Sequence, residues 1–228
     1  MAKVLALTTD GRLTYISPKE QRGKGRCNHV AHQKEGQSVA DFIKEIKNSQ
    51  DSALNDINKK DLEAVKKNGS ALRFIQNQTP EICMAAVKQD GSALQYVQNQ
   101  TPEICMEAVK QNSWALKYVQ DQTPELCMVA VKQNGWALNY VQDQTPELCM
   151  AAVKQDGCAL RFVQNQTPEI CMTAVKQDGS ALRFVQNQTP ELCMEAVKQN
   201  GRRALKYVQN QTPEIIQAAL EQDPDAIK

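Results

Sequence analysis

The sequence is poor in the residues from which active sites are usually built. Its 228 residues include two histidines and two tryptophans, and the formal net charge is +1. It lacks a G-x-G-x-x-G turn, a Walker A loop, an H-E-x-x-H helix and a G-x-S-x-G elbow. The near-neutral charge gives no general attraction to nucleic acid or to anionic membranes. We therefore expect no catalytic residues and no cofactor, and we interpret the protein as not being an enzyme.

Long apolar segments are also missing. No run reaches the roughly 18 apolar residues of a transmembrane helix, and the first residues do not form a charged-then-apolar leader. We expect neither a membrane span nor a signal peptide.

Cysteine is present, but its placement argues against disulfides. Six of the eight cysteines recur at one position of an internal repeat. Equivalent residues of stacked helices lie roughly 8–10 Å apart, which exceeds the roughly 7 Å limit between the Cα atoms of a disulfide. We expect reduced thiols in a core column and a cytoplasmic protein.

What the sequence has in abundance is one phrase. TPEICMAAVKQDGSALQYVQNQ occupies residues 79–100, and close copies follow immediately. Such a fixed period is the signature of a repeat architecture. The copies begin at Thr101, Thr123, Thr145, Thr167 and Thr189.

Each copy predicts two helices. Thr79 suits an N-cap, Pro80 the first helical position, and Glu81 the positive end of the helix dipole. We expect Gly91, a C-cap residue able to adopt a positive φ, to close this helix, and a shorter helix to follow. Neither helix is long enough to be stable alone, so neighbouring copies must stack. The sequence therefore predicts a mostly α fold: a right-handed-type α-solenoid of about seven 22-residue two-helix repeats.

The ends of the repeat array are altered. Residues 61–78 keep only the second half of the phrase, and residues 212–228 replace its Cys-Met pair, so both read as capping units. The copy that begins at Thr189 carries one extra residue near Gly201, where we expect a bulge or a tighter turn.

Residues 1–50 contain no copy of the repeat and have a different pattern. Two apolar runs around Asp10 and Gly11 predict a β-hairpin. A basic loop follows, and Ser38 with Asp41 makes a capping box that opens a helix. We expect two domains, residues 1–50 as an N-terminal module or cap and residues 51–228 as the solenoid.

Two candidate sites lie in the basic loop. A Cys-x-His-x-x-His cluster could supply three ligands to Zn²⁺, although a closed structural site needs a fourth. Basic residues next to glycines could contact an anion or a nucleotide. An ordinary surface loop is the simpler interpretation of both. The metal candidates are Cys27, His29 and His32, and the anion candidates are Arg22, Lys24 and Arg26.

Two positions of the repeat vary freely. The residue after the glycine position is Ser, Trp, Trp, Cys, Ser or Arg, and the residue three further on is Gln, Lys, Asn or Arg. No close-packed core accepts such a range, so we expect the first position at the surface or its edge and the second to be exposed. Their side chains should meet in five of the six copies, because the extra residue displaces the register in the sixth. The candidate partner-binding residues are Trp114, Trp136, Lys117, Asn139, Arg161, Arg183 and Arg202.

The two tryptophans have three interpretations. Trp114 and Trp136 could anchor a protein partner, since Trp and Arg dominate interface energetics. Each ring could instead pack over the neighbouring repeat. A base-stacking platform is the third possibility.

The phrase AVKQNGWALNYVQ, residues 130–142, and its siblings resemble a bacterial repeat family known as a domain of unknown function, number four-one-one-six. The resemblance covers about residues 57–228. It implies the helical-repeat fold and no activity. Members occur in intracellular bacteria, some as secreted effectors, so delivery into a host cell is one implication. This chain departs from the family in its near-invariant Gln-Asn/Asp-Gln-Thr-Pro-Glu linker.

We expect a non-enzymatic binding scaffold that presents its repeat surface to an extended protein or peptide partner. A nucleic-acid-binding protein that reads one base per repeat is an alternative. Its weakness is charge, because Glu81 and Asp90 against Lys88 give the copy at residues 79–100 a net charge of −1. A metal- or anion-dependent activity in residues 1–50 is a further alternative.

Overall fold

The computed structural model describes residues 4–8, 13–16, 29–34 and 36–226. By its contacts the chain divides into two units, residues 1–60 and residues 61–228, and each is described by itself. Residue 50, where the sequence predicted the boundary, lies inside helix α2 (Val39–Lys67), which continues through that point without a break.

The first unit contains a small antiparallel sheet with strand order β2-β1-β3. Strand β1 (Val4–Thr8) pairs with β2 (Leu13–Ile16) so that Val4 lies opposite Ile16, as a hairpin requires. The predicted hairpin is thus confirmed, while its Asp10-Gly11 turn lies outside the described residues. Strand β3 (His29–His32), which the sequence did not predict, adds to the other edge of β1.

Helix α2 begins as the sequence predicted. The Ser38 hydroxyl accepts a hydrogen bond from the Asp41 backbone N–H at 3.1 Å and donates one to Asp41 Oδ2 at 2.7 Å. This local pairing satisfies groups that a helix start leaves open.

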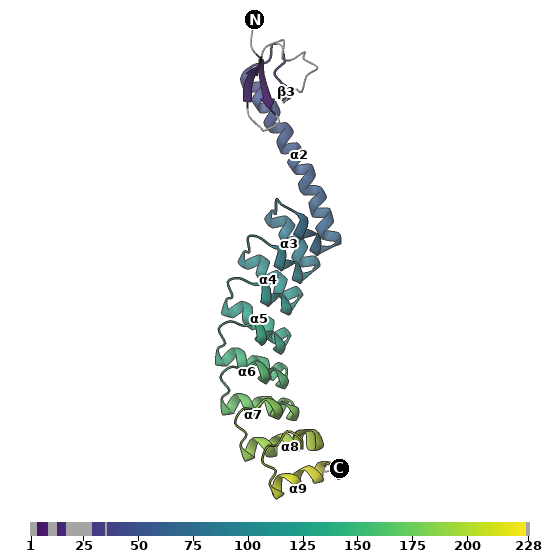
Figure 1. Ribbon diagram of the computed structural model, residues 1–228, viewed down its shortest axis with the longest axis vertical. Helices are drawn as coiled ribbons and strands as arrows, with labels where there is room; N and C mark the ends of the chain where they lie inside the picture. Colours follow the sequence, from purple (N-terminus) through teal and green to yellow (C-terminus); the bar gives the residue numbers. More distant parts are fainter. Residues whose placement is uncertain (1–3, 9–12, 17–28, 35, 227–228) are drawn as a thin grey trace. The chain divides into compact units, whose positions relative to one another are not determined.

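The second unit is a stack in which each α-helix from α3 to α7 is followed by a six-residue 3₁₀ helix (Figure 1). After η1 (Gly69–Phe74), successive layers pack one on the next. The pairs are α3 (Pro80–Gln89) and η2 (Gly91–Tyr96), α4 (Pro102–Gln111) and η3 (Ser113–Tyr118), α5 (Pro124–Gln133) and η4 (Gly135–Tyr140), α6 (Pro146–Gln155) and η5 (Gly157–Phe162), and α7 (Pro168–Gln177) and η6 (Gly179–Phe184). Helices α8 (Pro190–Leu205) and α9 (Pro213–Gln222) complete the stack. The mostly helical fold of about 22 residues per repeat is confirmed.

The start of each α-helix follows the predicted chemistry. The Thr79 hydroxyl accepts a hydrogen bond from the Ile82 N–H at 3.3 Å, and Pro80 occupies the first turn. The end differs from the prediction. The helix ends at Asp90, which is extended (φ −147°), and the Asp90 side chain caps the following 3₁₀ helix by accepting from the Ser92 N–H at 2.8 Å.

Gly91 is required for packing rather than for a positive φ. The one described glycine with a positive φ is Gly36. A Cβ at Gly91 would lie 2.4 Å from the carbonyl oxygen of Ala108 in the next layer, closer than real contacts allow. The prediction of a positive-φ helix end was therefore wrong, because glycine here lets two layers approach.

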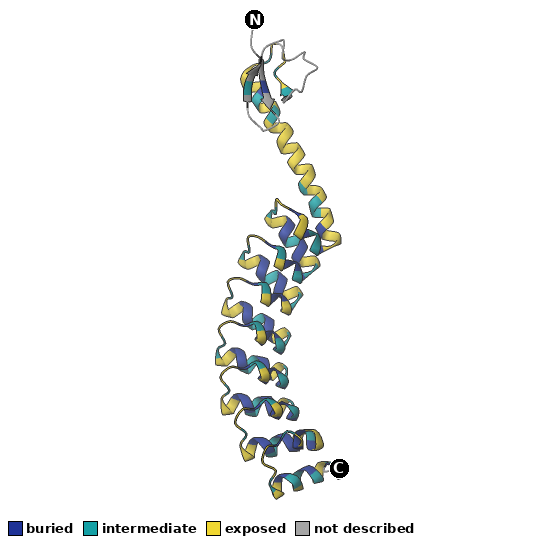
Figure 2. Cartoon of the chain, in the orientation of Figure 1, coloured by how far each residue is buried: buried dark blue, intermediate teal, exposed yellow. Residues whose placement is uncertain are grey.

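The core is a set of columns that run through the stack (Figure 2). The predicted column of repeat cysteines is confirmed, because each of these side chains is buried and free. In every full repeat the buried positions are Ile or Leu, Cys, Ala and Val of the α-helix and Ala, Leu and Val of the shorter element.

A glutamine in each linker ties consecutive layers together. The Gln122 Nε2 donates to the carbonyls of Tyr140 at 2.8 Å and Leu116 at 3.3 Å. Its Oε1 accepts from the Gln142 N–H at 3.1 Å and the Cys127 thiol at 3.5 Å. One side chain thus satisfies backbone groups of two layers, which explains why the linker hardly varies.

The extra residue near Gly201 changes the helix type. Asn200 and Gly201 are non-helical, and the residues that follow form an α-helical turn in place of a 3₁₀ helix. An α-helix holds more residues per turn than a 3₁₀ helix, so it absorbs one more residue over a similar length. Tyr207 consequently keeps the position of its counterparts, with its carbonyl accepting from Gln188 Nε2 at 2.8 Å.

None of the helices that the structure describes combines the length and hydropathy needed to cross a lipid bilayer.

Candidate functional site

The variable residues gather on the short elements. The short elements are the 3₁₀ helices η1 to η6 and, in the α8 layer, residues 201–207. We define the aromatic–cation row as the last two residues of each short element, one polar and one aromatic. The first member of every pair is exposed, as the sequence predicted, and each aromatic ring from Tyr96 onward is half-buried. The pairs are Arg73 and Phe74, Gln95 and Tyr96, Lys117 and Tyr118, Asn139 and Tyr140, Arg161 and Phe162, Arg183 and Phe184, and Lys206 and Tyr207.

The linker glutamines position this row. Each one donates its Nε2 hydrogen bond to the backbone carbonyl of the aromatic residue in the following layer, at 2.8–2.9 Å. The row is therefore held by the same bonds that join the layers. The donors are Gln78, Gln100, Gln122, Gln144, Gln166 and Gln188.

The short elements carry positive charge only. Residues 69–74, 91–96, 113–118, 135–140, 157–162, 179–184 and 201–207 contain no Asp or Glu. Within the described part of the chain, no carboxylate lies within ion-pair distance of their basic side chains. Their basic residues are Arg73, Lys117, Arg161, Arg183, Arg202, Arg203 and Lys206.

Cations lie over the aromatic rings of the row. The Arg161 guanidinium carbon is 5.0 Å from the centre of the Phe162 ring and 5.6 Å from that of Phe184 in the next layer. Arg183 repeats this bridge, at 4.4 Å from Phe184 and 5.9 Å from Tyr207. These contacts hold the guanidinium groups in place while their edges remain exposed.

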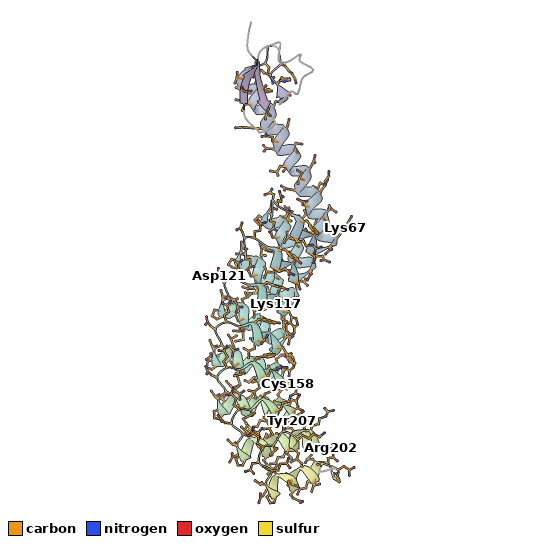
Figure 3. The ribbon with its side chains drawn as sticks, in the orientation of Figure 1. Lys67, Lys117, Asp121, Cys158, Arg202 and Tyr207 are labelled. Carbon is orange, nitrogen blue, oxygen red and sulfur yellow. The ribbon has the colours of Figure 1, made fainter. Side chains whose placement is uncertain are left out.

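Lys117 makes the corresponding contact in the middle of the stack. Its Nζ lies 4.5 Å from the centre of the Tyr118 ring. The hydrogen bond to Tyr118 raises the pKa of this exposed ammonium group. Asp121, by contrast, belongs to the linker edge of the stack (Figure 3).

The two tryptophans pack against the following layer. Trp114 meets Tyr140 edge-on with ring centres 5.7 Å apart, and Trp136 meets Phe162 at 5.5 Å. Arg161 also lies 5.5 Å from the Trp136 ring. The sequence predicted that each tryptophan would contact the residue three positions further along the same short helix. The ring contacts of the tryptophans are instead with aromatic rings of the next repeat.

Trp114 and Trp136 differ in their remaining exposure. Trp136 is half-buried, and its indole N–H donates to the Asp156 carboxylate at 2.7 Å. Trp114 is 38% exposed, and its indole N–H has no hydrogen-bond partner among the described residues. Trp136 thus fits the packing interpretation, and Trp114 retains a free polar edge at the surface.

The layer of Trp114 departs from the others at the residue before the tryptophan. Ser113 replaces the glycine that elsewhere lets layers approach. In the next layer Gln133 donates to the Lys110 carbonyl at 2.9 Å, whereas Gln155 accepts from the Gly135 N–H at 2.6 Å. At the opposite, N-terminal ends of α4 and α5, a pocket of about 580 Å³ is lined in part by Met106, Pro124 and Leu126.

Two rows of charge accompany the aromatic–cation row. In each full repeat a glutamate is exposed at the start of the α-helix and a lysine is exposed near the end of its first ten residues, where both complement the helix dipole. Backbone hydrogen bonding at the helix start lowers the pKa of Glu103. Both rows are fully explained by helix stability.

The remaining cysteine of the described residues, Cys158, is half-buried. Its thiol lies 3.5 Å from Asp178 Oδ2 and 3.9 Å from an Arg183 nitrogen. Burial, followed by the charge of Asp178, raises the pKa of this thiol. The raised pKa disfavours the reactive thiolate.

The candidate sites of residues 1–50 stay predictions. Cys27 lies outside the described residues, and the described ones contain no group of three or more potential metal ligands. His29 and His32 are the two ends of strand β3. The anion candidates Arg22, Lys24 and Arg26 also lie outside the described residues.

The repeated layers of the second unit coincide with segments that match a known family. A family model described as a domain of unknown function, DUF4116, matches the chain in six overlapping segments. The segments are residues 62–100, 79–123, 101–145, 123–167, 145–188 and 167–211. The chain belongs to this family. The DUF4116 matches begin near the end of α2 and extend through the α8 layer, so they contain the whole aromatic–cation row. No curated protein and no solved structure matches the chain.

The sequence indicated only part of this surface. It identified the variable cations and the tryptophans, but not the aromatic residue at the end of each short helix, whose ring from Tyr96 onward packs against the core. The signal was present, since this position is always Tyr or Phe and never an aliphatic residue. An aliphatic side chain would fill a core equally well; an aromatic one also offers a face to a cation.

Proposed function

We propose that the protein is a non-enzymatic scaffold that binds an extended polypeptide along its aromatic–cation row. The row repeats the same chemistry in successive layers while the side chains beside it vary. A partner that runs along the stack would therefore contact a different residue pair in each layer.

One observation carries this proposal: seven basic side chains of the short elements face no carboxylate partner among the described residues. Exposed cations that are held against rings, and that remain unpaired, are available to a partner's acceptors. Arg and aromatic residues are also the types that dominate protein interfaces.

The repeat cysteines favour a binding role over catalysis. They are buried in the core, and burial raises the pKa of the thiols, for example that of Cys171. A thiol with a raised pKa is a poor nucleophile at neutral pH.

A peptide-display selection against the full chain tests the proposal. We expect linear peptides that bind the wild type at least about tenfold more tightly than Arg161→Ala/Arg183→Ala. The control Lys154→Ala/Lys176→Ala removes the same charge from the α-helices of the same two layers, and it should bind the peptides like the wild type.

Failure to select any peptide, or equal binding by both double variants, would contradict the proposal. If parallel titrations show that single-stranded nucleic acid binds more tightly than the selected peptides, the partner is a nucleic acid and not a polypeptide.

A further inference from the structure

The spacing of the aromatic–cation row limits which extended chain can follow it. Arg161 lies 5.0 Å from the Phe162 ring and 5.6 Å from the Phe184 ring, which bounds the separation of neighbouring rings at about 11 Å, in line with the ~8–10 Å between packed helices. Arg183 gives a similar bound for the next step. These contacts set an upper bound only; taking the general ~8–10 Å between packed helices as the layer spacing, a chain that follows the row would repeat its contacts at about that interval.

Two extended conformations of a peptide differ in this respect. A β-strand presents side chains two residues apart to one face, with a repeat of about 7 Å. A polyproline II helix has three residues per turn and a rise of ~3.1 Å, so it presents every third side chain with a repeat of about 9 Å. The second repeat falls within the ~8–10 Å spacing of packed helices, and the first falls below it.

The charge of the row selects the side chains of such a peptide. Arg161, Arg183 and Lys206 are basic residues in three consecutive layers, and all are exposed. Their short elements contain no acidic residue. Carboxylates on the partner would complement this arrangement, and guanidinium edges bind carboxylates in a planar geometry.

The rings themselves argue against stacked bases. A stacking platform needs open ring faces. Phe184 has Arg161 and Arg183 over it, Phe162 has Arg161 over it and Trp136 at its side, and Arg183 lies near Tyr207. Proline-rich segments, by contrast, dock in aromatic-lined grooves in the polyproline II conformation.

We propose that the part of the row formed by Arg161, Arg183 and Lys206 binds an acidic peptide in the polyproline II conformation, with a carboxylate at every third residue. This inference rests on the proposed function and names the partner class for the same surface.

Two nine-residue peptides of identical composition test the spacing directly. The first is Glu-Pro-Pro repeated three times. The second is Glu-Pro-Glu-Pro-Glu followed by four prolines, which keeps the charge and the conformation but places the carboxylates two residues apart. Binding of each peptide to the full chain is measured by calorimetry at low salt, together with a nine-residue oligothymidylate.

We expect the first peptide to bind at least about tenfold more tightly than the second. The preference should disappear in Arg161→Gln/Arg183→Gln and persist in Lys154→Gln/Lys176→Gln. Thermal melts check that all variants are folded, and added salt should weaken the first peptide's binding.

Equal binding of the two peptides, lost in Arg161→Gln/Arg183→Gln, would overturn the threefold spacing and leave the proposed function standing. Absence of peptide binding, or binding that ignores these arginines, would overturn this inference; the display selection decides separately whether the scaffold proposal also fails. Tighter binding of the oligothymidylate than of either peptide would overturn the acidic-peptide class.

Discussion

The indole N–H of Trp136 donates a 2.7 Å hydrogen bond to the carboxylate of Asp156, one layer further along the stack. Trp114 occupies the same position one repeat earlier, but Asn134 stands where Asp156 would be. The two tryptophans therefore form a matched pair in which only one is bonded across the layer junction.

The first prediction uses this pair. Trp136→Phe should lower the free energy of unfolding by about 1–2 kcal/mol, because it removes a hydrogen bond to a charged group. Trp114→Phe should change it by less than about 0.5 kcal/mol. Urea denaturation followed by circular dichroism measures both. Equal effects would show that the Asp156 bond does not distinguish the two sites.

The second prediction concerns the linker glutamines. Gln122→Ala removes hydrogen bonds to four groups in two layers, so we expect a loss of about 2–4 kcal/mol. Gln142→Ala is the control, since its side chain is exposed and its backbone N–H remains in place. A small effect of Gln122→Ala, similar to that of the control, would mean that water replaces the side chain without loss.

The second unit could be predicted from the sequence because its local and repeated signals agree. Thr-Pro-Glu begins every full repeat's helix in the sequence and in the structure, and the cysteine column is buried as expected. The 3₁₀ type of the second element could not be predicted, because it depends on a cap from Asp90 and on contact with the next layer.

The variable cations of the aromatic–cation row were predicted from the sequence, but their arrangement was not. The variability of Lys117, Arg161 and Arg183 showed that they are exposed. That Arg161 and Arg183 bridge aromatic rings of consecutive layers depends on how the layers are stacked, which no single repeat contains.

The third prediction tests the close approach of the layers. Gly135→Ala would place a Cβ 2.5 Å from the Ala152 carbonyl oxygen, so we expect a destabilisation of about 1–3 kcal/mol. Ser113→Ala, at the equivalent position, adds no Cβ and should be milder, within about 1 kcal/mol. The unfolding midpoints of the two variants decide the matter, and a reversed order would contradict the role assigned to the glycine.

The fourth prediction follows from the buried thiols. Burial raises the pKa of the repeat cysteines, including Cys127 and Cys149. The folded state then holds its protons at a pH where the unfolded state has lost them. The free energy of unfolding is thus unaffected below about pH 8 and falls as the pH rises above the ordinary thiol pKa of about 8.5.

Urea midpoints at pH 7.5 and pH 10, in the presence of a reductant, measure this effect. The Cys127→Ala/Cys149→Ala variant should lose less stability between the two pH values than the wild type, because it has two fewer buried thiols to titrate. An identical loss in both proteins would mean that groups other than these two thiols cause the fall in stability at high pH.

The location of a bound peptide tests the central claim most directly. Hydrogen–deuterium exchange of the full chain, with and without a saturating selected peptide, shows which segments the partner covers. We predict protection at residues 157–162, 179–184 and 201–207, with the α-helical Lys154 and Lys176 segments unchanged. Protection confined to those α-helices, or to residues 1–60, would contradict a binding surface on the aromatic–cation row.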